Sequence, residues 1–107
     1  LMNELIKYDE FNKIAALDSY TAQFSDAAGG QVKKVYENTN KYLIGERSLP
    51  KGVTITGSKT GTTASAGSCL VMAVTGKDNS RYIAVVMKSQ DANVLYNEMN
   101  KVLEYTK

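Results

Sequence analysis

Two valine-rich apolar runs, residues 68–75 and 81–88, restrict the fold of this chain more than any other feature. A five-residue link, Gly-Lys-Asp-Asn-Ser at positions 76–80, joins them and has the residue types that tight turns use. Branched apolar side chains favour strands because they pack well on a pleated sheet. The pattern therefore predicts an antiparallel β-hairpin at the centre of the fold.

Further strands are predicted before this hairpin. Val53 and Ile55 alternate with threonines, which predicts a strand over residues 53–60. A weaker alternation over residues 19–35, interrupted by Ala-Gly-Gly at positions 28–30, indicates a second hairpin. Between them, Asn-Thr-Asn at positions 38–40 suggests a turn that leads into a short helix closed by Gly45.

Helices are predicted at both ends. Apolar residues recur at helical spacing over residues 2–17, which predicts one bent helix or two short ones, with Asp9 as an N-cap. Asp91 is a second candidate N-cap, for a helix that should pack on the sheet. Its apolar stripe consists of Leu95, Met99, Val102 and Leu103.

The order of these elements is helix, strands, helix, without alternation of strands and helices. That order favours the α+β class, an antiparallel β-sheet flanked by N- and C-terminal helices. The chain has 107 residues, enough for one modest core, so we expect a single domain over residues 1–107.

Composition excludes several function classes. The net charge is +2 with the basic residues scattered, so no nucleic-acid partner is indicated. No apolar run approaches the ~20 residues that cross a bilayer, and the N-terminus has no basic stretch leading into an apolar one. With no histidine and one cysteine, neither a metal site nor a histidine-based triad is expected. We interpret Cys69, within an apolar run, as a buried and inert thiol.

The strand over residues 53–60 leads into Lys59-Thr60-Gly61, which places a cation and a hydroxyl beside a glycine that permits close approach of another chain. Lys-Thr-Gly is one of three signatures of class A β-lactamases and penicillin-binding proteins. The whole run over residues 57–70, GSKTGTTASAGSCL, resembles the corresponding strand pair of the D-alanyl-D-alanine carboxypeptidase family. Residues 38–43 and 82–86 resemble the family's Asn-Thr-Asn turn and its next strand.

The resemblance implies a role for each residue of the motif. Lys59 and Thr60 would bind the terminal carboxylate of a peptidoglycan stem peptide, and Gly61 would let the peptide approach as an added strand. The N–H group of Thr62 would be one of two oxyanion donors, and Thr63 would support the strand end. The catalytic assignments are thus Lys59 and Thr62, with β-lactams as further ligands and no metal or cofactor.

The other two signatures of the family are not found. Ser48-Leu49-Pro50-Lys51 matches Ser-x-x-Lys in letters, but Pro50 and the following Gly52 argue against a helix there. Tyr36-Glu37-Asn38 matches a tyrosine variant of the Ser-x-Asn signature only in letters. We therefore expect the nucleophile upstream of Leu1, in a larger catalytic domain of which this chain is the C-terminal segment, with a partial β-lactamase/transpeptidase-like fold and no turnover of its own.

Two alternatives remain open at this point: a non-catalytic module that binds peptides or a partner protein, and an unrelated α+β domain that shares the motif by chance. The family resemblance implies a location outside the cytoplasmic membrane, at the cell envelope. It also predicts an uncovered strand edge beside apolar surface. We expect the chain to remain bound to the missing N-terminal segment or to pair with itself through the Val53–Thr62 strand.

Overall fold

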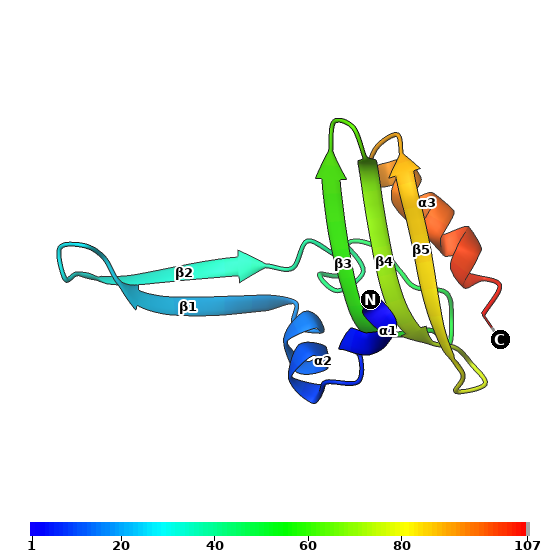
Figure 1. The fold of residues 1–107 in the computed structure, drawn as a ribbon, viewed down its shortest axis with the longest axis horizontal. Coiled ribbons are helices and arrows are strands. Elements are labelled where there is room, and N and C mark those ends of the chain that lie inside the picture. The colour runs from blue at the N-terminus through cyan, green and yellow to red at the C-terminus, as the bar shows by residue number, and fades with distance from the viewer. Residues whose placement is uncertain (107) are drawn as a thin grey trace.

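The computed structural model describes residues 1–106 and is built around one three-stranded antiparallel sheet (Figure 1). Its strands are β3 (Thr54–Thr63), β4 (Gly67–Thr75) and β5 (Arg81–Ser89), in the spatial order β3-β4-β5. A helix, α3 (Ala92–Leu103), runs along one face of the sheet. The predicted α+β class, with an antiparallel sheet and helices at both ends of the chain, is confirmed.

The central hairpin, β4 and β5, forms where the valine-rich runs predict it. Val71 pairs with Val85 and Ala73 with Ile83. The Gly76 N–H donates to the Ser80 carbonyl at 2.9 Å, and Asn79 adopts the left-handed conformation with φ of 66°. Asparagine tolerates that region better than other non-glycine residues, which explains its place in the turn.

The main core lies between α3 and the sheet. Asp91 caps α3 as predicted, because its carboxylate accepts a hydrogen bond from the Val94 N–H at 2.9 Å. The predicted stripe is wrong in one position: Val102 is 38% exposed, and Tyr96 is buried instead. Residues 95, 99 and 103 follow one another at four-residue spacing on one side of the helix, and residue 102 is rotated away from that side. The buried core residues are Tyr42, Val53, Leu70, Met72, Val74, Ala84, Leu95, Tyr96, Met99 and Leu103.

Two short helices, α1 (Met2–Leu5) and α2 (Asp9–Ala15), contact the sheet through β4 and β3. Their presence confirms one of the two arrangements predicted for residues 2–17. Asp9 is the first residue of α2 rather than its N-cap, which is Tyr8. A Cβ atom at Gly57 would lie 2.9 Å from the Phe11 ring, so the glycine is what lets α2 pack closely against β3.

A second hairpin, β1 (Ser19–Ser25) and β2 (Gln31–Glu37), confirms the alternation seen in the sequence and forms a sheet of its own. It projects away from the rest of the molecule (Figure 1). The Asp26 carboxylate accepts hydrogen bonds from the Ala28 and Gly30 N–H groups, which closes the turn.

The segment over residues 38–53 contains turns and no helix, so the short helix predicted before Gly45 is wrong. Side-chain hydrogen bonds fix the start of this segment: Asn38 Oδ1 accepts from the Asn40 N–H at 2.9 Å, and Asn40 Oδ1 accepts from the Tyr42 N–H at 3.0 Å. Such side-chain bonds to the backbone two residues ahead compete with helix formation.

The sheet face opposite α3 is only partly covered within residues 1–106. Beyond the area under α1 and α2, Val85 is 49% and Met87 is 73% exposed. Cys69 also lies on this face and is half-buried, so the interpretation of a fully buried thiol is wrong. Side chains alternate along a strand, and in β4 it is Ser68 and Leu70 that are directed into the core.

Candidate functional site

The Lys-Thr-Gly motif lies on β3, where strand alternation sends the side chains of Lys59 and Thr60 to opposite faces of the sheet. Lys59 is exposed and Thr60 is half-buried. The Lys59 ammonium group donates a hydrogen bond to the main-chain carbonyl of Thr60. The cation therefore lies beside the backbone of the motif.

Both residues line a hollow of about 310 Å³ beside β3. Its lining combines the cation and hydroxyls of the motif region with an apolar wall from α2. The lining residues are Phe11, Ile14, Ala15, Asn38, Thr39, Ser58, Lys59 and Thr60. Among residues 1–106, β3 pairs with β4 only, so its other edge is open to a peptide that adds as a strand.

A second hollow, of about 300 Å³, lies on the α3 side of β3. Its polar lining comes from Thr60, Thr62 and Ser68 on the sheet and from Thr39 and Lys41 on the preceding loop. The Thr39 and Thr60 hydroxyl oxygens lie 2.5 Å apart, within hydrogen-bond distance. The sequence prediction included Thr60 and Thr62 but missed Thr39 and Lys41, although the Asn-Thr-Asn resemblance marked that turn.

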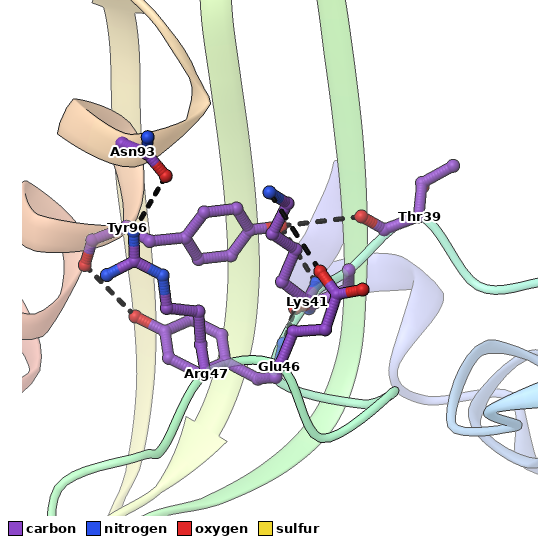
Figure 2. A network of polar contacts seen from close by, with 8 residues as sticks. Thr39, Lys41, Glu46, Arg47, Asn93 and Tyr96 are labelled. Carbon is purple, nitrogen blue, oxygen red and sulfur yellow. Dashed lines mark hydrogen bonds and ion pairs between the residues drawn. The ribbon is translucent and has the colours of Figure 1, made fainter.

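Tyr96 of α3 anchors this loop (Figure 2). Its hydroxyl accepts from the Lys41 N–H at 3.0 Å and donates to the Thr39 carbonyl at 3.4 Å. Arg47 extends the same anchorage by donating to the side-chain oxygens of Asn93 and Asn97 at 3.1 and 3.0 Å. The loop is thus fixed to the helix that packs on the sheet.

Tyr42 provides a second attachment of the loop to α3. Its hydroxyl donates to Asn100 Oδ1 at 2.6 Å, and its ring meets the Tyr96 ring edge-on. Burial, and then the neighbouring Tyr96, raise the pKa of Tyr42 to about 12, while Arg47 opposes this shift. The phenol of Tyr42 is therefore neutral across the physiological pH range.

Asn40 connects the loop to β3. Its side chain is buried, and Nδ2 donates to the Ser58 hydroxyl at 2.8 Å. Ser58 and Thr60 are on the same face of β3. The bond from Asn40 to Ser58 therefore helps to keep Thr39 next to Thr60.

The remaining motif residues extend toward the end of β3. Gly61 and Thr62 are exposed, and no heavy atom lies within 4 Å of the position of a Cβ atom at Gly61. Thr63 Oγ1 accepts from the Ala66 N–H at 2.9 Å. Gly67 has φ of 68°, and a Cβ atom there would lie 2.9 Å from the Ser89 carbonyl. These contacts shape the turn between β3 and β4.

The two segments that match the other family signatures only in letters, residues 48–51 and 36–38, do not form a site. Ser48, Leu49 and Pro50 have no regular structure and are followed by a turn at Lys51-Gly52, so no helix places Ser48 and Lys51 on one face. Tyr36 and Glu37 end β2, and Asn38 enters the next loop.

A larger hollow, of about 480 Å³, lies at the base of the β1–β2 hairpin between Ile14, Leu17, Tyr20 and Tyr36. It is mainly apolar and contains no basic side chain, so we place the candidate site at β3. No group of three or more possible metal ligands occurs within residues 1–106. None of the helices in that range is long and apolar enough to cross a membrane.

The sheet and the helices that flank it define the class: the chain has part of a β-lactamase/transpeptidase-like fold. The chain belongs to the D-alanyl-D-alanine carboxypeptidase family, whose model matches residues 1–91. No curated protein sequence matches the chain.

Three solved structures of mutants of the Streptomyces K15 DD-transpeptidase share the fold. They are 27%, 26% and 26% identical to this chain, with TM-scores of 0.75, 0.75 and 0.76. Each match covers 94% of this chain, and 36%, 37% and 37% of the respective structure. The chain therefore spans little more than a third of the proteins it resembles.

Proposed function

We propose that this chain is the C-terminal segment of a serine D,D-carboxypeptidase domain and supplies its substrate-binding strand. The observation that carries the proposal is the convergence of Lys59 and Thr60 on one hollow beside the open edge of β3. The substrate would be a peptidoglycan stem peptide that ends in D-Ala-D-Ala, and β-lactams would bind in its place.

Each motif residue has a chemical task in this proposal. The Lys59 ammonium and Thr60 hydroxyl bind the terminal carboxylate, and charge-assisted hydrogen bonds are the strong ones. The exposed backbone at Gly61 receives the peptide as an added strand. The Thr62 N–H stabilises the oxyanion that forms during acyl transfer.

The reaction is an acyl transfer to a serine and then to water, and it needs no metal or cofactor. The serine oxygen bonds to the carbonyl carbon of the penultimate D-alanine, and the bond to the terminal D-alanine nitrogen breaks, releasing that residue. Water then hydrolyses the ester. We place the serine in the rest of the domain, because Ser48 is not presented on a helix.

The open sheet face suggests where the rest of the domain binds. Exposed Val85 and Met87 and half-buried Cys69 lie on the side to which Lys59 is directed, around a hollow of about 250 Å³. Apolar surface beside an open strand edge favours association. We propose that the N-terminal part of the domain covers this face, and that without it chains pair through the edge of β3. Because peptidoglycan stem peptides lie outside the cytoplasmic membrane, the site would act there.

Labelling with a fluorescent penicillin tests the catalytic part of the proposal. We expect no covalent label on residues 1–107 alone, and a label on an upstream serine in a longer protein from the same reading frame. Covalent labelling of the isolated chain would show that it contains its own nucleophile. A reading frame without an upstream Ser-x-x-Lys helix would favour the non-catalytic peptide-binding module.

Sedimentation combined with intact-mass analysis tests the association. We expect either a complex with an N-terminal fragment, which Met87→Lys on the exposed face should weaken, or a self-associated species held together through the edge of β3. A stable monomer with no second polypeptide would contradict the proposed covering of this face.

A further inference from the structure

We infer that Thr39 is a positioning residue for carboxylate recognition, acting through the Thr60 hydroxyl. The inference rests on the proposed function of Thr60 as a carboxylate-binding group. It adds a residue outside the Lys-Thr-Gly strand, contributed by the loop that precedes it. The contact that carries it is the 2.5 Å separation of the two hydroxyl oxygens.

The hydrogen-bonding capacity of the two hydroxyls sets the direction of the bond. A hydroxyl has one donor and two acceptor positions, and an ionised carboxylate only accepts. When Thr60 donates its proton to a substrate carboxylate, it can no longer donate to Thr39. Thr39 must then be the donor, and Thr60 the acceptor, in the bond between them.

This arrangement strengthens Thr60 as a donor. A hydroxyl that accepts one hydrogen bond is polarised and donates the next more strongly. The bond from Thr39 also restricts the rotation of the Thr60 hydroxyl, so that its proton is directed toward the carboxylate. Thr39 is itself exposed, so a ligand can reach the hydroxyl pair without rearrangement of the core.

The position of Thr39 is held from two sides. The Tyr96 hydroxyl donates to the Thr39 carbonyl, and the Lys41 N–H donates back to that hydroxyl (Figure 2). On the other side, Asn40 donates to Ser58 on the same strand as Thr60. A side chain whose backbone is anchored to both α3 and β3 is suited to orient its partner.

The experiment compares ligands with and without the carboxylate. We would titrate the 15N-labelled longer protein from the same reading frame, with its penicillin-labelled serine replaced by alanine, using N-acetyl-D-alanyl-D-alanine and its C-terminal amide, and follow the amide shifts of Thr60 and Thr62. The variants are Thr39→Val, which has a similar shape without the hydroxyl, and Thr39→Ser, which keeps it. Lys59→Ala reports on the proposed function separately.

We expect this longer protein with wild-type Thr39 to prefer the carboxylate ligand and Thr39→Val to reduce that preference by roughly fivefold or more. Thr39→Ser should stay within about twofold of the wild type, since its hydroxyl can make the same bond. Thermal unfolding and the amide spectrum would show that both variants keep the fold.

If Thr39→Val weakened the binding of both ligands equally, Thr39 would have only a structural role and the inference would be overturned. If Lys59→Ala lost the preference while Thr39→Val kept it, the proposed function would stand and this inference would fail. If this longer protein with wild-type Thr39 and Lys59 failed to bind the two ligands or to distinguish them, both the proposed function and this inference would fail.

Discussion

Lys59 and Thr60 are consecutive residues whose side chains leave β3 on opposite faces of the sheet, yet both line the hollow beside the strand. The long lysine side chain makes this possible, because its ammonium group reaches back to the Thr60 carbonyl. A ligand at the edge of β3 can therefore meet a cation from one face and a hydroxyl from the other.

Among the described residues that line the hollow, Lys59 is the only charged one, so it should provide most of the electrostatic attraction for a ligand carboxylate. In the longer protein that contains this segment, Lys59→Ala should slow acylation by penicillin by an amount equal to about 1.5–3 kcal/mol, the usual value of a hydrogen bond to a charged group. Stopped-flow acylation kinetics would measure it. Lys51→Ala removes an exposed cation in a loop and is the matched control. An unchanged acylation rate in Lys59→Ala would contradict the assigned role.

The raised pKa of Tyr42 predicts a loss of stability at alkaline pH. Its pKa is about 12 in the fold against 10.0 ordinarily, so folding favours the neutral phenol. This contribution to the free energy of unfolding is complete below pH 10 and is lost as the pH rises towards 12, by at most roughly 3 kcal/mol. Urea unfolding between pH 8 and 12, compared with Tyr42→Phe, would measure it. Identical pH profiles for the two proteins would contradict the assignment to Tyr42.

Asn40 should contribute more to stability than other asparagines of the same network. Asn40→Ala leaves the Ser58 hydroxyl and the Tyr42 N–H without their partners, which should lower the free energy of unfolding by about 1–3 kcal/mol. Asn93→Ala is the control, because Asn93 is exposed and water can replace its bond to Arg47. Similar losses in both variants, measured in urea, would argue against a special role for the buried amide.

Cys69 should react with thiol reagents without unfolding, but slowly. The thiol is half-buried, and its sulfur lies 3.5 Å from the Lys88 N–H donor and 3.4 Å from the Ala66 carbonyl. A cysteine placed at exposed position 87, as Met87→Cys in a Cys69→Ser background, should label faster. If the rest of the domain covers this face, its addition should protect both positions. Labelling that requires global unfolding would restore the interpretation of a buried thiol.

Periodicity was sufficient to predict much of the fold. The hairpin of β4 and β5, the strand that carries the motif and the capped α3 follow from residue patterns because each pattern reflects a local preference or the burial of one face. Tyr96 shows the limit: its ring is apolar and its hydroxyl polar, so its burial depended on partners at Thr39 and Lys41 that no local pattern indicates.

The sequence by itself determined the α+β class, the position of the Lys-Thr-Gly motif on a strand and, through an extended resemblance, the family. Tertiary structure alone decided that Thr39 contacts Thr60, that Asn40 is buried against Ser58, and that Cys69 faces the open side of the sheet. The physical reason is that strand alternation assigns side chains to two faces, whereas what packs against each face depends on segments distant in the sequence.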